Sequence, residues 1–240
     1  MAPIRTQWTR LIRFVANETS RVHIGQPVDE ALDVGLAAYQ RKPIKAFEIA
    51  GSAVDPGAQV TTKVLTVKSL LTPLSREEVK LVRCLGLNYS DHADEARLTK
   101  PSFPVLFHKP VTSLIGPLAP VIIPKVAQPP RDHLPDYEVE LVIVIGKAAK
   151  NVSEADALDY VLAYSGVNDI FGVRQTVAFL SQGTTLEPGT IILTGTPKGV
   201  GFVKTPPLHL KHGDKMSVWL SHGIGTLCND VEEEASQAKL

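Results

Sequence analysis

The segment Tyr137–Gly146 reads YEVELVIVIG and indicates a β-strand more clearly than any other part of the chain. Its opening alternates the acidic residues Glu138 and Glu140 with the apolar residues Val139 and Leu141, and its second half is an almost continuous apolar run. Alternation with period two is typical of a half-buried strand, whereas an unbroken apolar run is typical of a fully buried one. The segment therefore predicts a strand that belongs to the core of a sheet.

Other short segments rich in Val, Ile, Leu and Thr extend this β-rich pattern. Strands are predicted over Arg10–Ala16, Arg21–Pro27, Val60–Val67, Lys80–Leu87, Val105–His108, Thr190–Thr194 and Lys215–Leu220. Helices are predicted over Asp91–Leu98, Ser153–Tyr164 and Gly172–Gln182. Ser90 is expected to cap the first of these helices. Together the segments predict an α+β fold dominated by strands.

Composition restricts the class of protein. The chain has 240 residues, of which 44% are hydrophobic and 21% charged, enough apolar material for a sizeable core. Its 25 basic and 25 acidic residues give a net charge of zero, so no global field attracts nucleic acid or an anionic membrane. No apolar run is long enough to span a bilayer and no signal peptide is evident. With two cysteines, the expected location is the reducing cytoplasm.

Glu138 and Glu140 are the first candidates for chemistry. At positions i and i+2 of a strand, their carboxylates point to the same face, about 7 Å apart along it. Beside a buried apolar run, two like charges lose hydration and repel each other, so a positive partner is expected. Carboxylate oxygens without a nearby cysteine favour Mg²⁺, Ca²⁺ or Mn²⁺. The alternative is an alternating strand whose polar face lies in water.

His92 and Glu95 form a second candidate group within Asn88–Glu95. On a short helix they lie at i and i+3 and can touch. A carboxylate next to an imidazole orients the ring and raises its basicity, as a general base requires. The alternative is a solvated helix face with one histidine among acidic residues.

A glycine-rich turn, Thr194–Gly201, follows the predicted strand Thr190–Thr194. Its three glycines and one proline allow backbone amides to approach a ligand closely. No Gly-Lys-Ser/Thr follows at Walker A spacing, so nucleotide binding is not supported. The alternative is an ordinary tight turn.

In this order, the motifs resemble the fumarylacetoacetate hydrolase family. The resemblance covers residues 82–231 and is carried by RCLGLNYSDHADE (Arg83–Glu95), FPVLFHKP (Phe103–Pro110), DYEVELVIVIGK (Asp136–Lys147), TLEPGTIILTGTPKGVG (Thr185–Gly201) and GIGTLCNDV (Gly223–Val231). It implies a β-rich roll or sandwich with a divalent cation at its mouth, in residues 73–240. Residues 1–72 resemble the small N-terminal domain of many members, with weaker motifs.

The resemblance also implies roles for individual residues. Glu138, Glu140 and Asp169 match the metal ligands, for Mg²⁺ or else Ca²⁺ or Mn²⁺. His92 and Glu95 match the dyad that activates water, and Lys109 and Thr196 match positions that contact the substrate.

The chain departs from the family pattern after Asp169. Members continue there with a Thr/Ser-Ala-Arg-Asp stretch, an active-site lysine and several strands. Here Asp169 and Ile170 run directly into FGVRQTVAFLSQG, which resembles the helix that follows all of these parts. A block near residues 169–171 is therefore absent, and the active-site lysine with it.

The resemblance implies a metal-dependent hydrolase or lyase that cleaves a C–C bond in a small β-diketo or α-keto acid, such as an acylpyruvate, through a metal-stabilised enolate. Alternatives are an oxaloacetate-type decarboxylase or tautomerase, and a catalytically impaired paralogue that acts as a binding protein. The expected partners are a small keto-acid substrate and a second copy of the chain in a homodimer, without nucleic acid or membrane.

Overall fold

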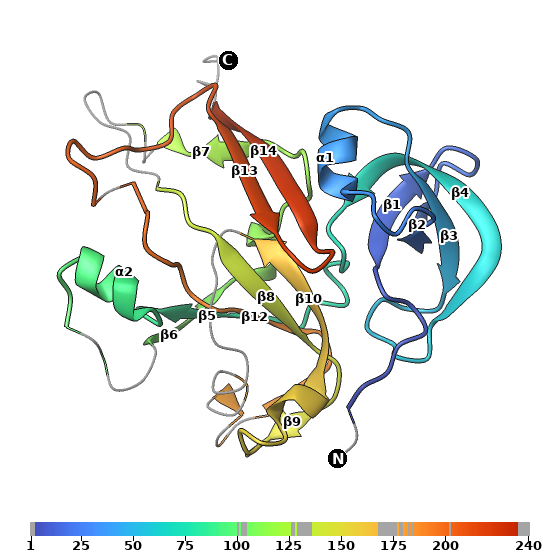
Figure 1. Ribbon diagram of the computed structural model, residues 1–240, viewed down its shortest axis with the longest axis horizontal. Coiled ribbons are helices and arrows are strands. Elements are labelled where there is room, and N and C mark those ends of the chain that lie inside the picture. The colour runs from blue at the N-terminus through green and yellow to red at the C-terminus, as the bar shows by residue number, and fades with distance from the viewer. Residues whose placement is uncertain are drawn as a thin grey trace, which may run out of the picture.

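The structure, a computed structural model, is built mainly of strands (Figure 1). It describes residues 3–99, 101, 105–125, 128, 136–167, 177, 180–181, 183, 185–201 and 203–234. Within these ranges the strands form a small barrel, a five-stranded sheet, a three-stranded sheet and a two-stranded pair. The β-rich α+β class expected from the sequence is confirmed.

The barrel lies at the N-terminal end of the chain and closes on itself. Its strands run in the order β1-β2-β3-β4, with bounds Ile12–Ala16, Val22–Pro27, Lys45–Ala50 and Gln59–Leu71. The predicted strands Arg10–Ala16 and Arg21–Pro27 are confirmed as β1 and β2, which pair antiparallel as a hairpin with Val15 opposite Val22. Phe14, Ala46 and Leu65 fill the interior. Closure leaves the barrel without a free strand edge.

The five-stranded sheet has the order β10-β8-β12-β5-β6. Its strands are β5 (Leu81–Gly86), β6 (Val105–Lys109), β8 (Glu140–Ile145), β10 (Val161–Val167) and β12 (Thr190–Leu193). Apolar side chains cover both faces of its centre, with Ile143 and Ile145 in one cluster and Val142 and Val144 in the other. A strand buried on both faces is expected to read as a continuous apolar run, and β8 does.

The remaining strands lie outside the barrel and the five-stranded sheet. They are β7 (Val121–Ile123), β9 (Ala149–Lys150), β11 (Thr185–Leu186), β13 (Lys215–Leu220) and β14 (Gly225–Glu233). The order β13-β14-β7 forms the three-stranded sheet, and β9 pairs with β11. Two 3₁₀ turns, η1 and η3, cover Val111–Ser113 and Ala157–Tyr160.

Cys84 and Cys228 are free thiols buried in different sheets. No described helix is long and apolar enough to cross a bilayer.

The expected helix Ser153–Tyr164 is wrong. The segment contains only the 3₁₀ turn η3, and from Val161 it becomes strand β10, which pairs antiparallel with β8. The same apolar spacing is compatible with a helix and also with one 3₁₀ turn followed by a strand. Pairing with β8 selects the second structure. The expected helix Gly172–Gln182 falls mostly outside the described residues.

Two local expectations also need correction. Helix α2 spans Ser90–Glu95, so Ser90 is its first residue rather than its cap. Tyr89 occupies the N-cap in an extended conformation and makes no capping hydrogen bond with its side chain. Strand β8 begins at Glu140, so Glu138 precedes it, separated by the single bridge residue Val139. Glu138 therefore lies just before the strand, and Glu140 lies at its first position, where it pairs with Val167.

Helix α1 (Val34–Tyr39) joins the barrel to the three-stranded sheet by packing against β14 (Figure 1). Asp33 caps the helix by accepting from the Leu36 N–H at 3.0 Å. It also accepts from the backbone N–H and the hydroxyl of Thr226, at 3.0 and 2.5 Å. The approach is so close that a Cβ on Gly35 would lie 1.5 Å from the Thr226 carbonyl oxygen. Only glycine fits at position 35, so it allows α1 and β14 to approach this closely. The hydrogen bonds between Asp33 and Thr226 then hold the two elements together.

We expect Asp33→Ala to destabilise the protein at pH 7 by about 0.5–2 kcal/mol, the usual cost of losing a side-chain N-cap. Partial burial alone would raise the pKa of Asp33, but hydrogen bonds from Thr226 and Leu36 outweigh it and lower the pKa. A group with a lowered folded pKa stabilises above its unfolded pKa of about 3.9 and loses that contribution as pH falls through the folded value. The difference between wild type and variant should therefore shrink in acid.

Urea unfolding at pH 7 and near pH 3 measures this difference. Asp55→Ala is the matched control, because Asp55 accepts from the Gly57 N–H within an exposed loop of the barrel. If the Asp33 variant lost the same free energy of unfolding at both pH values, the predicted link between stability and the ionisation of Asp33 would be contradicted.

Candidate active site

Glu140 is buried at the first position of β8. Its side chain is 1% exposed, and its Oε2 accepts from the Gly195 N–H at a long 3.3 Å. Burial raises the pKa of Glu140 to about 9, because the Gly195 N–H and the charge of Lys109 only partly compensate and Glu138 opposes ionisation. The sheet thus holds a buried carboxylate whose charge is poorly satisfied by the described residues.

Glu138 lies beside it at the open end of β8. Solvent reaches its side chain, yet the surrounding protein removes enough hydration to raise the pKa of this carboxyl. Lys109 and His92 act in the opposite direction, and Asp136 adds to the increase. Two adjacent carboxylates with raised pKa values are short of positive charge, and a bound cation would supply it.

The donor set fits a divalent cation bound by oxygen. Glu138 and Glu140 are the described residues that could hold it, and hard cations prefer such carboxylate ligands. Among the described residues no group of three acidic, histidine or cysteine side chains is placed to share one ion. The expected third ligand, Asp169, lies outside those residues.

Helix α2 places His92 and Glu95 on one face, as their spacing indicated. The His92 ring is buried, with 7% exposure, and its Nδ1 has no hydrogen-bond partner in the described structure. Glu95 Oε2 lies 3.9 Å from that nitrogen, beyond hydrogen-bond range. The charge of His92 lowers the pKa of Glu138, so the imidazole lies within electrostatic range of that carboxylate.

The glycine-rich turn after β12 connects both groups. Gly195 adopts φ +95° and donates to Glu140, while the Gly199 N–H donates to Glu95 Oε2 at 2.8 Å. Asn88 Nδ2 donates to the Thr194 carbonyl at 2.8 Å. A Cβ at Gly195 would lie 2.7 Å from the Leu85 carbonyl oxygen, so glycine is required there. The turn is therefore a structural part of the site rather than an ordinary connection.

The two expected substrate contacts lie at the edges of this arrangement. Lys109 ends β6, where it pairs with Val82, and its charge acts on both Glu138 and Glu140. Thr196 is buried with 8% exposure, and its hydroxyl donates to the Pro197 carbonyl at 3.2 Å. Lys109 thus lies within electrostatic range of both carboxylates, whereas the Thr196 hydroxyl is bonded within the turn.

Two neighbours of the glutamates, Tyr89 and Cys84, and one neighbour of the glycine-rich turn, Asn88, were not among the candidate residues predicted from the sequence. Burial raises the pKa of Tyr89 above its ordinary value, and the charge of Glu140 adds to the increase. Burial also raises the pKa of Cys84 to about 11, and both glutamates contribute. Asn88 anchors the turn. All three lie in the segment Arg83–Glu95, but the local pattern does not distinguish them from ordinary residues of a strand and its end.

The match to a family model agrees with this geometry. The model, described as fumarylacetoacetate (FAA) hydrolase C-terminal, matches residues 81–171 and 170–232. The two matches meet at residues 170 and 171, where the sequence indicated a missing block.

Individual relatives extend the match over almost the whole chain. Caffeoylpyruvate hydrolase of Neonothopanus nambi is 56% identical, with 98% of this chain and 96% of the relative covered. The mitochondrial oxaloacetate tautomerase fahd2 of Xenopus laevis is 27% identical, with 92% and 90% covered. The crystal structure of 2-hydroxyhepta-2,4-diene-1,7-dioate isomerase from Mycobacterium marinum has a TM-score of 0.70 at 27% identity, covering 95% of this chain and 99% of the isomerase.

The alignment with the Neonothopanus nambi enzyme is longer than this chain. It spans 279 positions against 240 residues, so at least 39 positions of the relative have no counterpart here. The identity over the whole alignment is nevertheless 56%, and the family model covers residues 81–232 in its two matches. The chain belongs to the fumarylacetoacetate hydrolase family.

Proposed function

We propose that this protein is a divalent-cation-dependent hydrolase that cleaves a C–C bond in an acylpyruvate-like β-diketo acid. The observation that carries the proposal is the buried Glu140 beside Glu138, with the buried His92 near enough for its charge to act on Glu138. The 56% identity to a caffeoylpyruvate hydrolase supports the substrate class. Mg²⁺ is the cation we favour, with Ca²⁺ or Mn²⁺ as substitutes.

Glu138 and Glu140 would hold the cation, with Asp169 as the proposed third ligand. When bound, a divalent cation polarises adjacent carbonyl and carboxylate oxygens and stabilises the negative charge that develops as the bond breaks. The Gly195 N–H donates to Glu140 and so helps to hold this carboxylate in place at the start of β8.

His92 is the proposed general base. A ring nitrogen takes a proton from the water that attacks the carbonyl, and the protonated ring later returns a proton to the departing carbon. Glu95 stabilises the charged ring and positions it, because the Gly199 N–H fixes its carboxylate on the adjacent turn. Lys109, directed toward the two glutamates, and Thr196 are the proposed contacts for the substrate carboxylate.

A second candidate reaction is the tautomerisation or decarboxylation of oxaloacetate. It is favoured by the similarity to oxaloacetate tautomerases and by the long separation of 3.9 Å between His92 and Glu95. These reactions need proton transfer but no attacking water. His92 and Glu95 therefore need not be aligned to activate a water molecule. A catalytically impaired paralogue is the third candidate, and the unmatched positions of the hydrolase motivate it.

Product analysis distinguishes these candidates. The full chain is incubated with caffeoylpyruvate and with oxaloacetate, each with and without Mg²⁺, and products are identified by chromatography. We expect Mg²⁺-dependent release of pyruvate from caffeoylpyruvate. Conversion of oxaloacetate alone would overturn the hydrolase in favour of the second candidate, and a folded protein inert toward both would favour the third.

We also propose a homodimer in the cytoplasm. Strand β6 is an edge of the five-stranded sheet, and its residues Val105, Leu106 and Phe107 are 40–49% exposed. Exposed apolar edges are readily covered by a symmetric partner. The buried free thiols Cys84 and Cys228 are compatible with a reducing compartment.

We expect light scattering after gel filtration to give twice the chain mass at micromolar concentration. Phe107→Glu on β6 should shift the protein toward the monomer, whereas Val64→Glu, at a similarly exposed position on the barrel, should not. A monodisperse wild-type monomer would contradict the dimer.

A further inference from the structure

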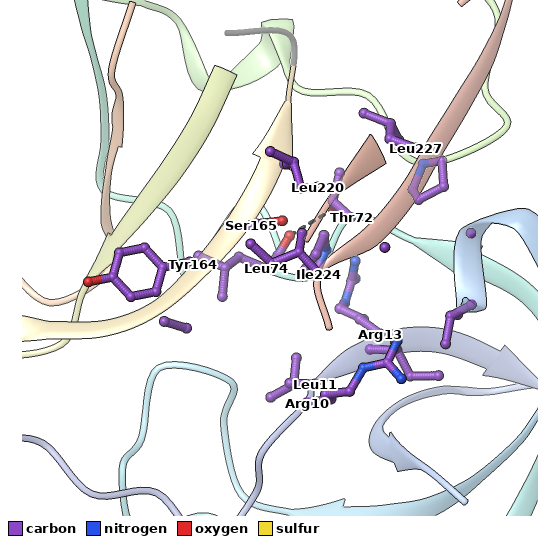
Figure 2. A pocket seen from close by; sticks show the side chains of 18 of the residues that line it. Arg10, Leu11, Arg13, Thr72, Leu74, Tyr164, Ser165, Leu220, Ile224 and Leu227 are labelled. Atoms are coloured by element: carbon purple, nitrogen blue, oxygen red, sulfur yellow. Dashed lines mark hydrogen bonds between the residues drawn. The ribbon is translucent and has the colours of Figure 1, made fainter. Parts of the chain in front are cut away.

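A cleft of about 460 Å³ lies between the barrel and the two larger sheets (Figure 2). Arg10, Leu11 and Arg13 border it on the side of the barrel. Ser165 of β10 and Leu220 of β13 border it on the opposite side. Its volume lies within the range of about 300–1,000 Å³ that is usual for small-molecule sites. The cleft is therefore large enough to enclose a ligand.

Most of the wall is apolar. Several segments of the chain contribute leucine and isoleucine side chains to it, among them Leu11, Leu71, Leu74, Leu162, Leu220 and Ile224. Trp8 also lines the cleft, is 6% exposed and belongs to a packed cluster with Leu162 and Ala163 of β10. Because removal of apolar surface from water is favourable, such a wall favours binding of a hydrocarbon group.

The charged groups of the wall are cationic. Arg10 and Arg13 line the cleft, whereas no aspartate or glutamate does among the described residues. Phe14 fills the barrel interior, so the alternation along β1 turns the neighbouring Arg13 to the outer face of the barrel. The wall therefore combines an apolar surface with positive charge.

The two arginines differ in the partners that they already have. Arg10 donates to the Glu30 carbonyl at 2.9 Å. The Arg13 guanidinium, in contrast, makes no hydrogen bond or ion pair with any described residue. Its charge acts on Glu77, but that carboxylate does not line the cleft. Arg13 is thus the cation of the wall that keeps its donors for a ligand.

We propose that the cleft binds a small carboxylate with an apolar body. The carboxylate pairs with Arg13, because a planar guanidinium can donate two parallel hydrogen bonds to it, and the apolar body lies against the leucine-rich wall. The site is separate from the proposed catalytic function, because none of the proposed catalytic or metal-binding residues within the described ranges lines the cleft.

Trp8 makes binding measurable without any turnover. The chain has two tryptophans, and Trp219 is 66% exposed, so Trp219→Phe leaves Trp8 as the single emitter at little cost to the fold. The probe is octanoate, titrated with EDTA present so that no cation at the glutamates attracts its carboxylate. We expect a saturable change of Trp8 emission, an affinity at least tenfold weaker for the uncharged octanamide, and no change with acetate.

Variants of the wall locate the probe. In the Trp219→Phe background, Arg13→Gln should weaken octanoate binding at least tenfold, because it removes the charge-assisted pair. Arg21→Gln is the matched control, since Arg21 is an exposed arginine just before β2 that does not line the cleft. Ser165→Leu fills part of the cleft from β10 and should also weaken binding at least tenfold, with both arginines retained.

Several results would overturn the proposal. They are the absence of a saturable change of Trp8 emission, equal affinities for octanoate and octanamide, and unchanged octanoate affinity in a folded Arg13→Gln variant. If that variant does not fold, unchanged affinity in Ser165→Leu overturns the site instead. Glu140→Gln should bind octanoate as its parent does, and loss of binding there would place the carboxylate at the catalytic group. Because binding is measured rather than turnover, failure of the proposed hydrolase activity would leave these outcomes unaffected.

Discussion

Glu140→Gln is expected to weaken Mg²⁺ binding by about 100-fold or more. Loss of groups that merely support metal ligands already costs 10- to 100-fold in affinity, and removal of a ligand itself should cost at least as much. The amide has the same shape as the carboxylate and can still accept from the Gly195 N–H, so the local structure should persist. Because the buried charge of Glu140 is poorly satisfied without a cation, the metal-free variant should be at least as stable as wild type.

Calorimetric titration with Mg²⁺ and Mn²⁺ measures the affinity, and thermal unfolding without metal measures the stability. Glu138→Gln should weaken metal binding in the same direction. Glu48→Gln is the control, because Glu48 is a carboxylate of the barrel that pairs with His23 and Lys63. Wild-type metal affinity in the Glu140 variant would refute the assignment of this residue as a ligand.

His92→Asn is expected to lower kcat by roughly 10²- to 10⁴-fold, the usual contribution of a positioned general base. The asparagine is smaller but polar, and the buried ring nitrogen that it replaces has no hydrogen-bond partner in the described structure, so no bond is lost in folding. Metal affinity should change little, since His92 is not a proposed ligand.

Initial rates on caffeoylpyruvate, with Mg²⁺ titration in parallel, separate the two effects. His222→Asn is the control, because His222 is exposed, bonds to Ser221 and lies outside the catalytic group. Glu95→Gln retains an acceptor for the Gly199 N–H but loses the charge, so its kcat should fall less than that of the His92 variant. Unchanged kcat in the His92 variant would disprove the role of the dyad.

Much of the fold could be predicted because local pattern and burial agree. The strands β8, β5 and β13 are short segments rich in apolar residues that are typical of a sheet. Each of them lies within the range that the sequence pattern predicted. The segment Ser153–Tyr164 was mispredicted because its apolar spacing fits two structures, and the strand pairing of β10 with β8 selects one. Ser90 likewise has the chemistry of a cap, but the extended conformation of Tyr89 moves the start of the helix.

The candidate site divides in the same way. Sequence alone determined the pairs Glu138 with Glu140 and His92 with Glu95, because the repeat of a strand or helix fixes neighbours two or three residues apart. Only the tertiary structure decided how the pairs meet. The Gly195 N–H bonds to Glu140 across 55 residues, and the Gly199 N–H bonds to Glu95 across 104. Such contacts depend on the order of β8, β12 and β5 in the sheet, and no local period encodes that order.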